Sequence, residues 1–115
     1  MSETSFSQRM HGVLDRLEQG IEMAAEGADV DLEVSRSGNV IEIEFADGAQ
    51  MVINTHEAVG EVWVASRRAG YHFRPQAEGR WRDTRRGIDL LVLLTEEISV
   101  QAGRKLDLTA IELPH

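Results

Sequence analysis

Cysteine is absent from this chain of 115 residues. Disulfide bonds, thiolate zinc sites, protein-ligated iron–sulfur clusters and cysteine nucleophiles are therefore excluded. No apolar run approaches the roughly 18 residues of a membrane span, and residues 1–8 lack the basic and apolar segments of a secretion signal. From these absences we expect a cytoplasmic protein in a reducing compartment, without membrane partners.

Positive charge is scarce at the start of the chain. Residues 1–45 contain no lysine and three arginines against ten carboxylates, a net charge of −7, out of −8 for the whole chain. Packing carboxylates this densely costs folding free energy by self-repulsion. The acids therefore indicate a surface that receives cations or a basic protein. The same balance argues against a nucleic-acid partner, because a phosphate backbone repels such a chain.

One basic band stands against this acidic half. Its stretch of sequence contains only two acids, Glu78 and Asp83. We interpret the band as a set of solvated arginines in turns and at an edge, namely Arg67, Arg68, Arg74, Arg80, Arg82, Arg85 and Arg86.

The first helix is predicted by apolar residues at spacings of three and four, namely Phe6, Met10, Val13, Leu14, Leu17, Ile21 and Ala24. Ser5 followed by Gln8 resembles a capping box at its start, and Gly27 a C-terminal stop. At 100° per residue, one set of polar side chains falls within an arc of about 80° beside the apolar stripe. We call this set the acidic ridge; it comprises His11, Asp15, Glu18, Glu22 and Glu26.

After Gly27 the apolar period changes from 3.6 to 2, as strands with one buried face require. We predict strands at residues 29–34, 41–45, 50–54, 62–66, 71–74 and 80–83, followed by a helix at 88–102 that ends at Gly103. Asp89 is favourably placed at the N-terminus of that helix. The pattern predicts an α+β fold with one domain over residues 1–115: a two-layer sandwich, with both helices on one face of a six-stranded antiparallel sheet.

The other face of this sheet is expected to be open to solvent and to carry function. With a first hairpin turn centred on Gly38, Glu33 lies opposite Glu42 and Asp31 opposite Glu44, like charges that a bound cation would relieve. Val62 and Val64 take the inward side of their strand. Trp63 is therefore predicted to point outward with Asn54 and His72, as a partner-binding hot spot.

We assign Trp81 to packing in the core. His56 and His115 are expected to be solvated, and His72 is expected at an interface.

The chain resembles a known family over essentially its whole length, from Phe6 to about Leu108. The resemblance rests on the order of elements together with Asp-Gly before the third strand, Asn54, Val-Trp at 62–63, Gly-Tyr-His-Phe at 70–73, Trp81, Arg85 and Gly87. In these features it is similar to the bacterial frataxins of the CyaY type. It departs from their Asn-x-Gln-x-Pro-x-x-Gln loop, because His56, Ala58 and Glu61 stand where that loop has its glutamines and proline.

The resemblance implies an iron-binding protein that modulates iron–sulfur cluster assembly by docking on the cysteine desulfurase and its scaffold protein. Iron, ferrous or ferric, suits carboxylate and imidazole ligands. The expected metal ligands are the acidic ridge and the acids that follow it, namely His11, Asp15, Glu18, Glu22, Glu26, Asp29, Asp31 and Glu33. The expected partner-binding residues are Asn54, Trp63, His72, Glu42 and Glu44.

The ridge is too long to serve one ion, since His11 to Glu22 spans about 16 Å at 1.5 Å per residue. Only neighbours share a metal, so binding is expected to be weak and labile, at roughly 10⁻⁶ to 10⁻³ M by analogy with weak carboxylate calcium sites. Other divalent cations are expected to compete.

Two alternatives remain at this point. A ferroxidase or iron-detoxifying activity needs two irons close together on the ridge, and the chain has no enclosed site of the kind that catalysis requires. A small acidic client chaperone needs a large exposed apolar patch. Residues 106, 108 and 111 form an apolar tail that is expected to cover such a groove. We expect a monomer, with iron-driven oligomers left open.

Overall fold

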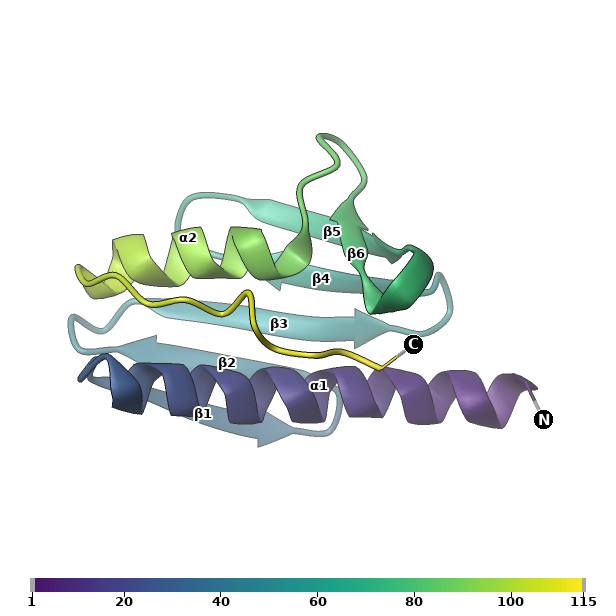
Figure 1. Ribbon diagram of the computed structural model, residues 1–115, viewed down its shortest axis with the longest axis horizontal. Coiled ribbons are helices and arrows are strands. Elements are labelled where there is room, and N and C mark those ends of the chain that lie inside the picture. The colour runs from purple at the N-terminus through teal and green to yellow at the C-terminus, as the bar shows by residue number, and fades with distance from the viewer. Residues whose placement is uncertain (1, 115) are drawn as a thin grey trace.

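The computed structural model describes the backbone of residues 2–114 and the side chains of residues 6–114. Two helices flank a six-stranded antiparallel meander of strand order β1-β2-β3-β4-β5-β6 (Figure 1). The elements are α1 (Ser2–Gly27), β1 (Leu32–Ser37), β2 (Val40–Phe45), β3 (Gln50–His56), β4 (Glu61–Ala65), β5 (Gly70–Pro75), a short 3₁₀ turn (Ala77–Gly79), β6 (Trp81–Asp83) and α2 (Leu90–Ala102). The predicted fold class is confirmed.

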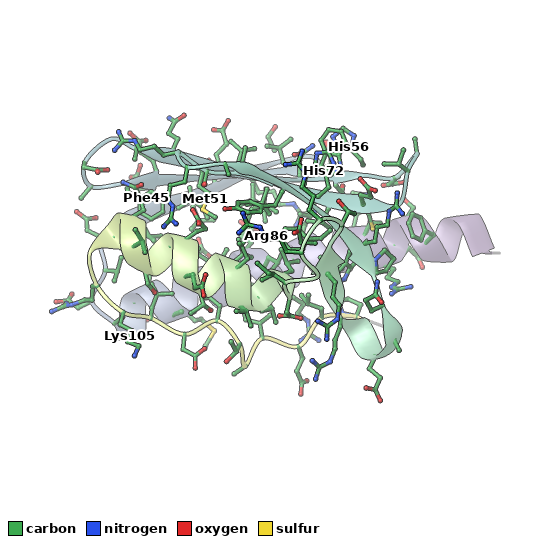
Figure 2. The ribbon with its side chains drawn as sticks, turned by 90° about the horizontal axis from the view of Figure 1, so that it is seen from above. Phe45, Met51, His56, His72, Arg86 and Lys105 are labelled. Atoms are coloured by element: carbon green, nitrogen blue, oxygen red, sulfur yellow. The ribbon has the colours of Figure 1, made fainter. Side chains whose placement is uncertain are left out.

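Both helices cover the same face of the sheet, and apolar side chains fill the space between the two layers (Figure 2). Leu14, Leu17 and Ile21 of α1 are fully buried there, as are Leu90, Leu94 and Ile98 of α2. They meet the inward residues of the strands, such as Ile43, Ile53 and Phe73. Trp81 belongs to this core, as predicted, with 1% of its surface exposed.

The first helix begins earlier than the sequence indicated. It starts at Ser2, so Ser5 and Gln8 both lie inside the helix and the predicted capping box is wrong. Its end at Gly27 is confirmed, but the left-handed residue that turns the chain is Asp29, with φ of 56°. The Val30 N–H then donates to the Ala25 carbonyl at 2.8 Å, which closes the helix end.

The first hairpin is shifted from its predicted register. Gly38 and Asn39 form a two-residue turn in which Gly38 has φ of +60°, a conformation typical of tight hairpins. The pairing of β1 with β2 is thus displaced by two residues from the predicted pairing. As a result Glu33 lies opposite Glu44 and Ser35 opposite Glu42, while Asp31 precedes the strand and has no partner in β2.

The second helix is capped at both ends as its sequence indicates. The Asp89 carboxylate accepts hydrogen bonds from the N–H groups of Leu91 and Val92, at 3.0 and 3.2 Å. Gly103 ends the helix in a left-handed conformation with φ of 70°. The helix begins at Leu90, two residues later than predicted, because Asp89 takes an extended N-cap conformation.

After α2 the chain runs back in an extended tail between the two helices (Figure 1). Leu106, Leu108 and Leu113 are buried in the core cluster. This tail covers the groove that the client-chaperone alternative requires. Within residues 2–114, neither helix is long and apolar enough to cross a membrane.

Candidate metal-binding and partner-docking surfaces

The acidic ridge lies along the outer side of α1, and most of it is exposed to solvent. One basic residue from the neighbouring strand reaches its first half. The Arg36 guanidinium of β1 contacts the Asp15 carboxylate, lies 3.7 Å from the Glu18 carboxylate, and approaches the His11 Nδ1 atom at 3.5 Å. Only 16% of the Arg36 side chain is exposed. A metal ion bound by His11 and Asp15 would therefore compete with a guanidinium already in place.

The second half of the ridge and the acids that follow it lack such a partner in the described part of the chain. Among the side chains of residues 6–114, no lysine, arginine or histidine lies within ion-pair distance of Glu22, Glu26, Asp31 or Glu33. The Asp29 carboxylate lies 3.8 Å from the Arg104 guanidinium, but it is fully exposed, so solvent screens this pair. The uncompensated negative charge thus lies at the C-terminal end of α1 and along β1.

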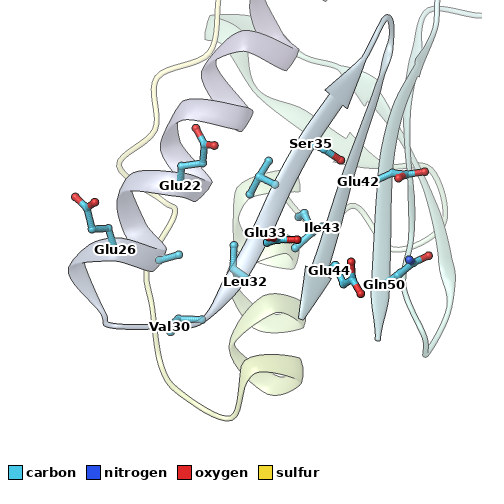
Figure 3. A pocket seen from close by; sticks show the side chains of 12 residues that line it. Glu22, Glu26, Val30, Leu32, Glu33, Ser35, Glu42, Ile43, Glu44 and Gln50 are labelled. Carbon is cyan, nitrogen blue, oxygen red and sulfur yellow. The ribbon is translucent and has the colours of Figure 1, made fainter. Parts of the chain in front are cut away.

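A groove of about 600 Å³ follows β1 at this place (Figure 3). Glu22 and Glu26 of α1 border it on one side, and Glu33, Glu42 and Glu44 of the hairpin border it on the other. Its floor is apolar, formed by Ala25, Val30, Leu32 and Val34.

The structure brings the predicted metal residues to one side of the molecule, but it does not gather them into one site. Within the part of the chain whose side chains are described, no three histidine, aspartate or glutamate side chains are arranged to hold one ion. Cation binding on this surface would therefore use pairs of carboxylates completed by water, as in weak and exchangeable sites.

Three of the predicted partner-binding residues lie side by side on the open face of the sheet, as predicted. Asn54 of β3, Trp63 of β4 and His72 of β5 are neighbours across the strands. The Trp63 indole is stacked between two imidazoles, with ring centroids 3.5 Å from His56 and 4.1 Å from His72. Both faces of the indole are thus covered, and a partner would meet the edges of a three-ring stack.

His56 is therefore an important residue that sequence reasoning missed, because it was expected to be solvated. The signal was present, since His56 lies two residues beyond Asn54 on the same side of its strand. The contact between His56 and Trp63 also depends on the register between β3 and β4, which cannot be predicted from the sequence pattern. His115, the other histidine expected to be solvated, lies outside the described residues.

A buried carboxylate holds this stack in place. Glu61 is 6% exposed and accepts hydrogen bonds from Trp63 Nε1 at 2.8 Å and from Arg74 Nε at 2.9 Å. Its Oε1 atom also lies 3.7 Å from His72 Nδ1. The hydrogen bond from Arg74, followed by that from Trp63, lowers the pKa of Glu61 and outweighs the effect of burial. In the sequence, Glu61 was noted only as a departure from the loop pattern of the bacterial frataxins. In the structure it accepts the hydrogen bonds that position Trp63 and Arg74 on the open face.

The arginine band is exposed, as interpreted from the sequence. Two of its members pair with carboxylates, Arg74 with Glu61 at 2.9 Å and Arg68 with Glu97 at 3.8 Å. The band lies on β5, β6 and their loops, at the opposite edge of the sheet from the acidic residues of β1.

The fold and these two surfaces define a class: small two-layer α+β proteins with an acidic helix-and-edge surface and an aromatic group on an open sheet face. A family model described as a frataxin-like domain matches residues 1–104 of this chain. The chain belongs to the frataxin family.

Its relatives include bacterial proteins named "iron-sulfur cluster assembly protein CyaY". That of Cupriavidus taiwanensis is 45% identical over 106 residues, covering 92% of this chain and 95% of the relative. That of Vibrio cholerae is 42% identical over 107 residues, covering 93% and 98%.

Solved structures agree with this assignment. The frataxin from Psychromonas ingrahamii superimposes with a TM-score of 0.77 at 27% identity, covering 90% of this chain and 96% of that one. A trimeric frataxin from Saccharomyces cerevisiae, solved in complex with ferrous iron, gives a TM-score of 0.71 at 26% identity, covering 84% and 87%.

Proposed function

We propose that this protein acts in iron–sulfur cluster assembly, where it binds iron weakly and docks on the cysteine desulfurase and its scaffold protein. The observation that carries the proposal is the uncompensated acidic surface of α1 and β1. Carboxylate oxygens are the ligands that a hard cation such as ferric iron prefers, and ferrous iron accepts them as well. The family membership, and the names of the CyaY relatives, connect this surface with cluster assembly.

Iron binding is proposed to concentrate at Glu22, Glu26, Asp31 and Glu33, together with Glu44 across the hairpin. Glu33 and Glu44 lie directly opposite each other in the ladder, and like charges in this position repel. A bound cation removes that repulsion, so the hairpin gains stability when the ion binds. The two-ligand geometry keeps affinity low and exchange fast, which suits transfer of iron to a partner rather than storage.

The docking surface is proposed to have two parts with different roles. The acidic surface attracts a basic face of the desulfurase and sets the rate of encounter. The stack of His56, Trp63 and His72, with Asn54 beside it, provides the desolvated contact that slows dissociation.

An anaerobic titration tests the iron site. Ferrous iron is added to ¹⁵N-labelled protein, and the amide signals that broaden are mapped. We expect broadening around Glu22, Glu26, Asp31 and Glu33, with weaker effects near His11 and Asp15, where Arg36 competes. Raising the salt concentration should weaken binding, because exposed charges are screened.

Two triple variants with the same change in net charge provide the comparison. Glu22→Gln, Glu26→Gln and Glu33→Gln together should lower iron affinity at least tenfold. The matched control carries Glu57→Gln, Glu96→Gln and Glu112→Gln, three exposed acids outside the groove, and should bind nearly as wild type does. Broadening that centres on His56 and His72 instead would show that imidazole anchors the metal and would overturn the proposed site.

A further inference from the structure

We propose that the free edge of β1 accepts one further strand from a partner protein, an extended segment in which basic residues alternate with apolar residues. The proposal rests on the proposed function, because it identifies the chemistry of the partner segment that this acidic surface receives. In the six-stranded sheet that residues 2–114 form, β1 pairs with β2 alone and is therefore an edge strand. An edge strand offers unpaired N–H and C=O groups to an incoming strand.

The register shows which backbone groups of β1 are free. The Phe45 N–H donates to the Ala49 carbonyl, away from β1, so Leu32 opposite Phe45 has no ladder bond to it. Hydrogen-bonded and non-bonded pairs alternate along an antiparallel ladder. The backbone groups of Leu32 and Val34 therefore point toward the free edge. Within residues 2–114, no backbone bond from outside the hairpin reaches them.

One end of this edge is already closed by Arg36. Its side chain lies on the inward side of β1 and is held by Asp15 and Glu18 of α1. An inward-pointing charge is a common way to protect an edge strand from unwanted pairing. The open part of the edge therefore covers Leu32 to Ser35, which is the part that the groove follows (Figure 3).

The groove determines the chemistry of the added strand. Successive side chains of a strand point to opposite sides of the sheet. Beside β1, one set would lie over the half-buried apolar floor of Val30, Leu32 and Val34. The other set would lie on the open face beside Glu33, with Glu44 in the next strand. Apolar residues fit the first set and basic residues the second.

A second copy of this chain does not fit the same edge. Two β1 strands side by side would bring Glu33 of one copy, with Glu44 behind it, close to the same acids of the other. Like charges at this spacing repel, and no lysine or arginine of the open half of β1 offsets them. The acids thus exclude self-pairing and favour a basic strand.

The test uses an acetylated and amidated six-residue peptide of alternating lysine and valine. Two peptides of the same amino-acid composition serve as controls: one has methylated backbone nitrogens, and one has three lysines followed by three valines. We expect the alternating peptide to bind at least tenfold more tightly than either control. Hydrogen exchange of the Leu32 and Val34 amides should slow at least tenfold on binding. Equal affinity for all three peptides, or unchanged exchange at these amides, would overturn the proposal.

A pair of protein variants locates the site. Val34→Lys places a positive charge on the floor of the groove, and Val100→Lys makes the same change at a valine of α2 that is 59% exposed. We expect the first to weaken binding of the alternating peptide at least tenfold and the second less than threefold, with both proteins folded by circular dichroism. Loss of binding in both, or in neither, would contradict the assignment.

A binding measurement with the purified desulfurase–scaffold complex, made alongside the peptide experiments, separates this inference from the proposed function. If the purified desulfurase–scaffold complex fails to bind the protein while the peptide protects Leu32 and Val34, the proposed function fails and the edge site stands. If the complex binds and the peptide gives no protection, the edge site fails and the proposed function stands.

Discussion

Glu61 shows how one buried charge organises a surface that is otherwise exposed. Its two oxygens receive the Trp63 indole N–H and the Arg74 guanidinium, and these bonds fix the indole between two imidazoles. A buried carboxylate is costly unless its hydrogen bonds are satisfied, and here they are. The open face is therefore arranged before any partner arrives, which lowers the entropic cost of binding.

The lowered pKa of Glu61 gives stability a defined dependence on pH. Because the folded-state pKa lies below the ordinary value of 4.5, the folded protein favours the ionised form. The resulting stabilisation is complete above about pH 4.5 and is lost as the pH falls through the folded-state pKa. At pH 7 we expect Glu61→Gln to lower the free energy of unfolding by about 1 kcal/mol, since Arg74 is largely exposed and its pairing is screened.

Urea unfolding at pH 7 and at pH 3 measures this effect. The difference between wild type and Glu61→Gln should shrink at pH 3. Glu57→Gln changes an exposed glutamate nearby in the sequence and should alter stability little at either pH. A difference between wild type and Glu61→Gln that is the same at both pH values would show that ionisation of Glu61 does not stabilise the fold.

At the scale of elements, the C-terminal tail depends on two glycines of α1. A β-carbon added at Gly12 would lie 2.9 Å from Pro114 Cγ, and one added at Gly20 would overlap the side chain of Ile111. Neither glycine is required by a special backbone conformation, because both lie inside a regular helix. They are needed because the tail approaches the helix closely at these two positions.

Gly20→Ala should therefore lower stability although alanine is the better helix former. Its helix propensity contributes about 1 kcal/mol in favour of the variant. Overpacking against Ile111 typically costs about 1–3 kcal/mol, and we expect it to prevail with a net loss of about 1 kcal/mol. Thermal unfolding measures the change.

The partner residue and a third glycine complete this test. Adding Ile111→Ala should remove most of the penalty of Gly20→Ala, so a double-mutant cycle should show coupling of about 1 kcal/mol. For Gly27→Ala, no atom of the described part of the chain lies within 4 Å of the new β-carbon, so stability should be unchanged or raised. Additive effects of Gly20→Ala and Ile111→Ala would mean that the Ile111 side chain does not pack against Gly20.

At the scale of the whole molecule, charge is arranged along the order of the strands. Acids concentrate on α1, β1 and β2, whereas residues 67–86 carry seven arginines against two acids, a net of +5. The acidic edge and the arginine band lie at opposite ends of the sheet. A protein polarised in this way approaches a charged partner in a preferred orientation, which raises the rate of productive encounter.

Association kinetics with the desulfurase should therefore separate the two parts of the docking surface. The variant with Glu22→Gln, Glu26→Gln and Glu33→Gln should associate more slowly, with a weaker dependence on salt, and dissociate at nearly the wild-type rate. Trp63→Ala should mainly dissociate faster, at a cost of about 2 kcal/mol of binding. Stopped-flow measurements at low and high salt give both rates.

Melting curves provide the check on the tryptophan. The loss of two stacking contacts should lower the stability of Trp63→Ala by about 1–3 kcal/mol, since each aromatic pair contributes about 0.5–1.5 kcal/mol. If Trp63→Ala unfolds the protein, the open face cannot be treated as a docking surface separate from the core. If the acidic variant changes only the dissociation rate, the acids form direct contacts rather than steering the encounter.

The sequence by itself determined the layers of this protein and the side on which each residue lies. Periods of 3.6 and 2 assigned the two helices, the six strands and their buried faces, because side-chain direction follows local backbone geometry. Trp63 was thereby placed outward and Trp81 was assigned to the core. The separation of negative from positive charge along the chain was also evident, since it depends only on which residues occur in which part of the sequence.

Tertiary structure alone decided which residues meet. The turn at Gly38 and Asn39 set Glu33 opposite Glu44 instead of Glu42, a displacement of two residues from the predicted pairing. Arg36 reaches Asp15, and Glu61 supports Trp63, through distances that depend on register and on how α1 packs on β1. Such contacts are non-local, and one residue of slip in a strand changes them all. The sequence therefore predicts the surfaces, and the folded chain determines the chemistry within them.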